Sequence, residues 1–176
     1  LIYYFTGKVM DHHLVYYGNS TLSSVAEKVE NIDGAVISLI SEMSDIMVRE
    51  KGLGLAAPQV DVGKRIIIVD PGDNKNSRFV LINPEIKEFS SQLGTYEEGC
   101  LSVPGIFTDI IRPSEVLVKG VTTEGKEAEF EASGLAARIL QHEIDHLDGI
   151  LFIDRVDKYI RDEFRVELKK IKKLNR

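Results

Sequence analysis

The pattern of hydrophobic and polar residues predicts a helix in the first third of the chain. Between Asp33 and Glu50, hydrophobic side chains recur every three or four residues, which is the spacing of one helix face. The positions on this predicted buried face are Val36, Ile37, Ile40, Met43, Met47 and Val48. Gly52 and Gly54 follow directly and are expected to end the helix.

Short hydrophobic runs further along predict strands. RIIIVD (65–70) is typical of a buried strand, and FVLINPEI (79–86) predicts a second one in which Pro84 limits the ladder hydrogen bonds. EVLVKGV (115–121) and KEAEFEA (126–132) flank TTEG and predict a hairpin. Alternation along the second of these strands places Ala128, Phe130 and Ala132 on one face.

A second helix is predicted after this hairpin, from a cap at Ser133 to about Leu147, with Gly149 ending it. One of its faces carries Leu135, Ile139, His142 and His146, and Leu140, Ile144 and Leu147 cover much of the rest. A helix that is apolar nearly all round lies in the interior. Strands with interspersed helices, without regular alternation of the two, predict an α+β fold of antiparallel sheets packed around this central buried helix.

The last part of the chain predicts a C-terminal surface helix from about Arg155 to Leu174. Its apolar stripe consists of Val156, Ile160, Phe164, Leu168 and Ile171. The net charge of the chain is −6, but residues 154–176 hold nine basic and five acidic residues, which leaves +4 here and −10 on the rest. A basic tail on an acidic body favours an anionic partner such as RNA. The competing interpretation is a solvated amphipathic helix, which has the same composition.

The bulk composition predicts one globular domain. The 176 residues are 43% hydrophobic and 28% charged, which allows a sizeable core. The sequence has no apolar run of about 18 residues, so no transmembrane helix is expected. LIYYFTGKVM (1–10) lacks the features of a secretory signal, so residues 1–9 are expected to be a leader ahead of Met10, and 10–176 the domain. The lone cysteine, Cys100, excludes an intrachain disulfide and suits a reducing cytoplasm.

Residues 142–146 of the second helix fit the pattern H-E-x-x-H. Residues four apart on a helix are neighbours, so His142 and His146 can bind one metal ion, while Glu143 reaches a water on that ion. The competing interpretation is a chance match. Two core imidazoles without partners would be costly, and this favours a metal.

Two histidines leave a catalytic metal site one ligand short, and the sequence offers several candidates. Glu163 or Glu167 would complete a general zinc peptidase, and His12 or His13 would add a third imidazole. Cys100, in EEGCLSVPG, is favoured because a thiolate is a good soft ligand for late first-row metals, although a lone cysteine is more commonly a small buried hydrophobe.

A site of two imidazoles and one thiolate with an open position would bind Zn²⁺ or Fe²⁺ and activate water, with Glu143 as the general acid and base. GLGLAAPQ (52–59) fits such a site. Gln59 offers an amide donor for a developing oxyanion, and Gly52 and Gly54 allow a substrate backbone to approach closely. The same segment is otherwise a tight turn between a helix and a strand.

Three segments together resemble the signature motifs of the peptide deformylases, in the right order and spacing. They are GLGLAAPQ (52–59), EEGCLSVPG (97–105) and QHEIDHLDG (141–149), and the resemblance covers about residues 13–157. It is closest to the bacterial type. It implies a cytoplasmic enzyme that removes the N-formyl group from formyl-methionine on nascent peptides and releases formate, with no membrane or DNA partner.

The resemblance also implies roles for individual residues. Cys100, His142 and His146 would bind Fe²⁺, with Zn²⁺, Ni²⁺ or Co²⁺ as substitutes; Glu143, Gln59, the Leu101 backbone N–H and the Gly54 backbone would be catalytic. The methionine pocket would include Gly52, Leu53, Gly99, Leu135 and Ile139, with Glu98 and Arg138 at its rim. Arg112 and Asp145 match a pair that supports the metal helix, and the basic tail matches one that docks on the ribosome in some bacterial members.

Two segments depart from the family pattern. GNSTLSS (18–24) replaces an Asp-Pro and a following Leu-Arg, and Phe107 stands where some members have a basic residue. The first departure concerns the geometry of the N-terminal segment, and the second leaves the contacts to the peptide beyond methionine open. A non-catalytic metal-binding or ribosome-associated module is the remaining alternative, and Glu143 argues against it because a structural site needs no base.

Overall fold

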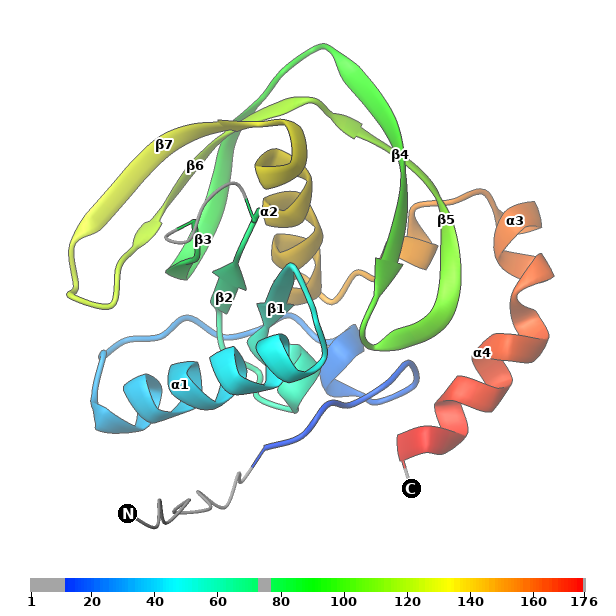
Figure 1. Cartoon of the computed structure of the whole chain (residues 1–176), viewed down its shortest axis with the longest axis horizontal. Coiled ribbons are helices and arrows are strands. Elements are labelled where there is room, and N and C mark those ends of the chain that lie inside the picture. Colours follow the sequence, from blue (N-terminus) through cyan, green and yellow to red (C-terminus); the bar gives the residue numbers. More distant parts are fainter. Residues whose placement is uncertain (1–11, 73–76, 176) are drawn as a thin grey trace, which may run out of the picture.

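The computed structural model describes residues 12–72 and 77–175, and its main layer is a five-stranded antiparallel sheet (Figure 1). The strand order is β1-β2-β3-β6-β7. The strands are β1 (Gly54–Ala56), β2 (Ile66–Val69), β3 (Phe79–Phe89), β6 (Glu115–Val121) and β7 (Glu127–Ser133). The predicted strands and the predicted hairpin are confirmed, and the register of β3 against β6 shifts next to Pro84, which cannot donate a ladder hydrogen bond.

A second, two-stranded sheet stands apart from the first. It consists of β4 (Leu93–Cys100) and β5 (Val103–Pro113), which pair antiparallel along their length. The sequence predicted neither strand, because this part of the chain has no clean alternation of hydrophobic and polar residues. Cys100 is therefore the last residue of β4, at the turn of this hairpin.

The helix α2 (Gly134–Leu147) lies between the two sheets (Figure 1). It packs against the strands of the main sheet on one side, and its polar side chains meet β4 and β5 on the other. Ser133 occupies the N-cap position as predicted, but its side chain makes no capping hydrogen bond. Gly149 has a φ of 72° after the last turn, which suits a residue without a side chain.

The helix α1 (Gly34–Arg49) is confirmed, and its predicted buried face is partly wrong. Ile37 and Val48 are 44% and 55% exposed, whereas Leu39 and Ile46 are buried instead. The helix also ends before the glycines. Lys51 takes the left-handed conformation with a φ of 58°, and the N–H of Gly52 donates to the carbonyl of Met47.

The tail is not the single helix that the sequence predicted. It forms α3 (Lys158–Glu163) and α4 (Arg165–Ile171), with a break at Phe164, and a 3₁₀ turn over Lys172–Asn175. The apolar stripe explains the break. A spacing of four residues drifts by about 40° per step around a straight helix, so three such steps move the stripe about 120° off its face. Breaking the helix returns Leu168 and Ile171 to the core beside β5.

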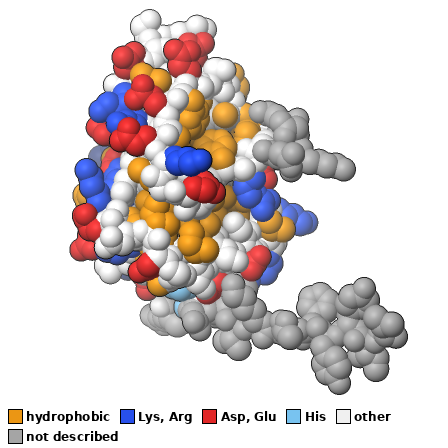
Figure 2. Space-filling view, turned by 90° about the vertical axis from the view of Figure 1, so that its left-hand side faces the viewer, with side chains coloured by type: hydrophobic (Ala, Val, Ile, Leu, Met, Phe, Trp, Pro, Cys, Tyr) orange, Lys and Arg blue, Asp and Glu red, His pale blue; other side chains and the backbone are white. Residues whose placement is uncertain are grey.

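The described part of the chain is therefore a mixed fold of helices and antiparallel sheets, as predicted. Three further 3₁₀ turns, Thr21–Ser23, Ala57–Val60 and Phe152–Asp154, complete it. Hydrophobic side chains gather in a band across one face, with acidic and basic side chains around it (Figure 2). Among the described helices, none is long and apolar enough to cross a bilayer. The expected leader, residues 1–9, lies outside the described residues.

Candidate metal centre and active-site cleft

Cys100, His142 and His146 converge at one point. Their potential ligand atoms all lie within 4.8 Å of one another, and they are the one such group among the residues that the structure describes. The Cys100 Sγ lies 3.2 Å from Nε2 of His146, and the two imidazole rings, one helical turn apart, have centroids 5.1 Å apart. β4 supplies the thiol and α2 supplies both imidazoles, so the group depends on how the hairpin docks against the helix.

The donor set fits a late first-row divalent ion. One thiol and two imidazoles are the ligand types such ions prefer, and three protein ligands leave a position open for substrate or water. The electrostatics of the two histidines point the same way. Burial lowers the pKa of both imidazoles. Contacts with Cys100 and Glu98 outweigh burial at His142 and raise its pKa well above the ordinary value. The pKa of His146 is lowered further by the neighbouring His142. Two adjacent buried imidazoles resist being charged together, and a shared metal ion removes that conflict.

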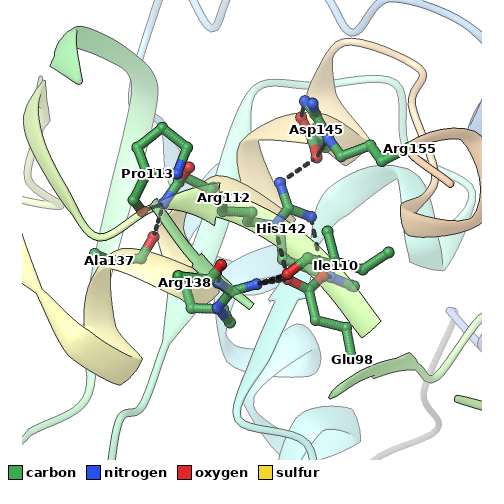
Figure 3. A network of polar contacts seen from close by, with 11 residues as sticks. Glu98, Ile110, Arg112, Pro113, Ala137, Arg138, His142, Asp145 and Arg155 are labelled. Atoms are coloured by element: carbon green, nitrogen blue, oxygen red, sulfur yellow. Dashed lines mark hydrogen bonds and ion pairs between the residues drawn. The ribbon is translucent and has the colours of Figure 1, made fainter. Parts of the chain in front are cut away.

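A buried polar network holds the outer nitrogen of His142 (Figure 3). Glu98 Oε2 lies 2.9 Å from His142 Nδ1, and Arg112 donates to both oxygens of Glu98 at 2.7 and 2.9 Å. Arg112 also donates to Asp145 at 2.7 Å, and Arg155 pairs with the same carboxylate. Burial would raise the pKa of Glu98, but the hydrogen bonds from His142 and Arg112 hold it well below its ordinary range. The carboxylate therefore stays charged and orients the imidazole.

Glu98 and Arg138, which the sequence predicts at the rim of the methionine pocket, line the cavity from buried positions. Their exposed fractions are 6% and 8%, and Arg138 donates to Glu98 Oε1 at 2.7 Å. Arg138 also donates to the carbonyls of Ile110 and Gly94, which ties α2 to both strands of the β4–β5 hairpin. The long β4–β5 pairing, which the sequence did not predict, places Glu98 of β4 where it meets Arg138 of α2. The Arg112–Asp145 contact was expected, whereas the role of Glu98 as the common partner of Arg112, Arg138 and His142 was missed.

Glu143 occupies the next position on α2 and is 4% exposed. Its Oε2 is buried and has no hydrogen-bond partner among the described residues. Burial raises the pKa of Glu143 to about 7, partly offset by His142. A carboxyl group with a pKa near neutrality can both accept and return a proton, which is what a general acid and base requires.

Gln59 points its amide nitrogen at the group formed by Cys100, His142 and His146. Its Oε1 accepts from the backbone N–H of Ala56 at 2.9 Å, which fixes the orientation of the amide. Its Nε2 then lies 3.5 Å from Cys100 Sγ and 3.3 Å from Ser102 Oγ. Gln59 is 2% exposed, so this donor is held in place before any ligand arrives.

The two glycines of the first motif are required by close approaches. A side chain on Gly52 would meet Leu101, 2.9 Å from the position of its first carbon. A side chain on Gly54 would collide with the Glu143 carboxylate and with Ile139. β1 thus lies directly against α2 at Glu143, which only a residue without a side chain allows.

One cavity of about 620 Å³ joins these groups. Every predicted site residue except His146 lines it: Gly52, Leu53, Gly54, Gln59, Glu98, Gly99, Cys100, Leu101, Leu135, Arg138, Ile139, His142 and Glu143. Its wall also includes residues that the sequence did not single out: Leu14, Tyr16, Glu50, Lys51, Glu97, Pro104, Gly105 and Leu174. Phe107, 60% exposed, packs over Gly99 at its edge. The missed residues come from the N-terminal segment, the end of α1, the β4–β5 hairpin and the last turn, where no periodic pattern marks them.

The other candidates for a third ligand lie elsewhere. Glu163 and Glu167 are exposed on α3 and α4, outside the cavity. His13 is exposed, and His12 Nδ1 contacts Glu42. The geometry therefore favours Cys100 over each of the alternatives.

Comparison with known proteins identifies the family. The model of the polypeptide deformylase family matches residues 11–162. A peptide deformylase of Picosynechococcus sp. is 48% identical over 149 residues, which is 84% of this chain and 80% of that protein. The chain belongs to the peptide deformylase family. A second member, from Thermodesulfovibrio yellowstonii, is 48% identical over 155 residues, covering 87% and 93% of the two chains.

Solved peptide deformylase structures have the same fold. That of Legionella pneumophila superposes with a TM-score of 0.86 at 39% identity and covers 92% of this chain and 95% of its own. That of Plasmodium falciparum reaches 0.85 at 36% identity, with 90% and 94% covered. Membership makes the chain an enzyme, a metal-dependent hydrolase that removes the N-formyl group from nascent peptides.

Proposed function

We propose that the cleft deformylates formyl-methionyl peptides with Cys100, His142 and His146 as metal ligands and Glu143 as the general acid and base. The observation that carries this proposal is the unpartnered, buried carboxylate oxygen of Glu143 beside the converging thiol and imidazoles. When bound, a divalent ion supplies Lewis acidity and lowers the pKa of water. The chain's own residues then position the substrate and move the proton.

The proton pathway runs through Glu143. Its carboxylate accepts the proton of the attacking water and returns it to the amine nitrogen as the C–N bond breaks, releasing formate and a free amino terminus. The Nε2 of Gln59 and the backbone N–H of Leu101 donate to the oxyanion that develops on the formyl oxygen. The backbone of Gly54 positions the formyl group, since it lies against Glu143 with no side chain between them.

The methionine side chain would occupy the apolar part of the cavity. Leu53, Leu135 and Ile139 line it, and Gly52 and Gly99 leave room for the peptide backbone. Glu98 and Arg138 close this region from the inside through their ion pair. The packing of both sheets around α2 would thus place the reactive groups at the bottom of the cleft.

Fe²⁺ is the proposed native metal, with Zn²⁺, Ni²⁺ or Co²⁺ able to replace it. The mixed sulfur and nitrogen ligand set accepts each of these ions, so the protein does not select strongly by ligand type. The deciding experiment is formate release from formyl-Met-Ala after anaerobic purification, with metal content measured in the same samples. Activity that follows iron content and declines in air supports Fe²⁺, whereas equal activity with zinc alone, stable in air, contradicts it.

We further propose that the basic tail contacts the ribosome, which would place the enzyme in the cytoplasm where nascent chains emerge. Lys169, Lys170 and Lys173 are exposed on the last turns, and phosphate contacts would bind them to RNA. Removing the tail is a poor test, because Leu168 and Ile171 belong to the core. Replacing the three lysines by glutamate should reduce co-sedimentation with ribosomes, while reversing Lys87 and Lys119 on the sheet should not. Equal co-sedimentation of both variants would contradict the proposal.

A further inference from the structure

The active-site cavity does not end at the methionine pocket. Leu14, Tyr16, Glu50 and Leu174 line the cavity that contains the metal group, and the same four residues line an adjoining cavity of about 390 Å³. The two cavities therefore border on the same four residues, and together they are referred to as the groove. These four residues belong to the N-terminal segment, the end of α1 and the last turn of the chain.

Side-chain hydrogen bonds hold the last turn against the N-terminal segment. Asn175 Oδ1 accepts from the backbone N–H of Tyr16 at 2.8 Å, and its Nδ2 donates to the carbonyls of Tyr16 and Tyr17 at 2.9 and 3.2 Å. The two segments are 159 residues apart in the sequence. In Figure 1 the red end of the chain accordingly lies beside the blue N-terminal segment and below the turn between β4 and β5.

Two further contacts keep this turn from moving along the surface. The stem of Lys172 packs directly on Gly18, where a side chain would collide with it and where the φ of +94° suits glycine. Ile171 is buried in the core one turn earlier. Leu174, between Lys172 and Asn175, is left 53% exposed and faces the groove. An exposed apolar side chain is thus part of the wall that an occupant of the groove would meet.

We propose that Leu174 is a specificity-determining residue for the peptide positions beyond the second residue of the substrate, and that Asn175 is the positioning residue that holds it there. The occupant is the downstream part of the same formylated peptide. Leu174 lines the same cavity as Cys100, His142 and Glu143, and an extended peptide leaving that centre advances by about 3.3–3.6 Å per residue. This inference rests on the proposed placement of formyl-methionine at the metal.

The wall chemistry indicates which peptides gain from the groove. Leu14, Tyr16 and Leu174 offer apolar surface, and the one acid that both cavities share, Glu50, has its charge paired with Arg49 at 2.9 Å. Apolar side chains at the third and fourth peptide positions should therefore bind better than glycine. A dipeptide has no residue beyond the second position, so by this inference its KM should not depend on Leu174.

The test compares three substrates on matched variants. They are formyl-Met-Ala, formyl-Met-Ala-Leu-Leu and formyl-Met-Ala-Gly-Gly. Leu174→Ala should raise KM for the Leu-Leu peptide by about fivefold, because an apolar contact is lost, and leave kcat and the KM for the dipeptide unchanged. Leu174→Met, which conserves volume, should keep the wild-type KM. Leu93→Ala is the control, because Leu93 is a similarly exposed leucine, at 60%, that does not line the groove.

Asn175→Ala tests the positioning role with Leu174 intact. It should reproduce the rise in KM for the Leu-Leu peptide and again spare the dipeptide. Unchanged KM values for all three substrates, or equal changes for all three, would overturn the inference. The absence of formate release from every substrate, wild type included, would instead refute the proposed function of the cleft. If Asn175→Ala destabilises the fold, its lowered midpoint of urea unfolding shows this. The comparison of Leu174→Ala with Leu174→Met then decides whether Leu174 contributes to peptide binding.

Discussion

Glu98 Oε2 lies 2.9 Å from His142 Nδ1, and only 5% and 11% of the two side chains are exposed. Glu98 stands two residues before Cys100 on β4, so one strand provides both the proposed thiolate ligand and the carboxylate that contacts His142. With Nδ1 engaged by the carboxylate, Nε2 is the nitrogen available to a metal ion. Arg112 and Arg138 neutralise the same carboxylate from two further elements.

Replacing Glu98 should weaken metal binding. Glu98→Gln removes the charge that orients His142 and leaves two buried arginines poorly compensated, so metal affinity should fall by about 10–100-fold. Competition with a chelator measures this affinity. Glu97→Gln is the control, because Glu97 is an exposed neighbour on the same strand. Equal affinities of the two variants would show that the contact does not orient the imidazole.

Replacing Glu143 should abolish turnover and spare the metal. Glu143→Gln keeps the shape of the side chain but cannot accept a proton, so kcat should fall by about 10²–10⁴-fold or more. Metal content per chain, measured by elemental analysis, should stay at the wild-type level. Wild-type activity of Glu143→Gln would show that Glu143 is not the general acid and base. Loss of metal from this variant would indicate that Glu143 is itself a metal ligand.

Replacing Cys100 distinguishes the ligand sets. Cys100→Ala should lose the metal and the activity together, since two imidazoles alone do not complete a catalytic site. Glu163→Ala and Glu167→Ala should change neither, because both side chains are exposed away from the cavity. Metal loss in a glutamate variant, with Cys100→Ala unaffected, would favour the zinc peptidase arrangement.

The close approach of β1 to α2 makes Gly54 irreplaceable. Gly54→Ala places a methyl group against the Glu143 carboxylate and Ile139. Formate release should fall by at least about tenfold, because even a small displacement of a catalytic group slows the reaction strongly. Gly63→Ala is the matched control, because nothing lies within 4 Å of the added carbon. Wild-type kcat/KM for Gly54→Ala would show that the strand can move aside without cost.

The raised pKa of Glu143 predicts how the stability of the metal-free protein depends on pH. The pKa rises from 4.5 to about 7 mainly by burial, so the folded state resists losing this proton. Ionisation of Glu143 therefore destabilises the folded state. This loss of folding free energy is absent below pH 4.5, grows as the pH rises, and is complete above about pH 7, where it amounts to roughly 3 kcal/mol.

Urea unfolding at pH 5 and pH 8 measures this effect. The stability advantage of metal-free Glu143→Gln over the metal-free wild type should be larger at pH 8. Both proteins retain Glu98, whose lowered pKa adds stability above pH 4.5 that is lost on acidification, so its contribution cancels in the difference. An advantage that does not change with pH would contradict the shift.

Local periodicity accounts for the parts of the fold that the sequence predicted. β2, β3, the β6–β7 hairpin and the two long helices each carry an apolar pattern of the right period over enough residues. The β4–β5 hairpin has no such pattern, because its inward positions hold charged groups such as Glu98 and Arg112 that form ion pairs only in the folded protein. The break at Phe164 was likewise hidden, since each half of the tail follows the helical pattern.

The sequence by itself determined the candidate reactive groups: His142, Glu143 and His146 follow from one helical turn, and Cys100 and Gln59 from short motifs. Only the tertiary structure decided what surrounds them. It buried Glu98 against His142, and it joined Leu174 to the cleft through Asn175 and Tyr16. The physical reason is that residues four apart on a helix meet whatever the rest of the chain does. A contact between segments 159 residues apart depends on how every intervening element packs.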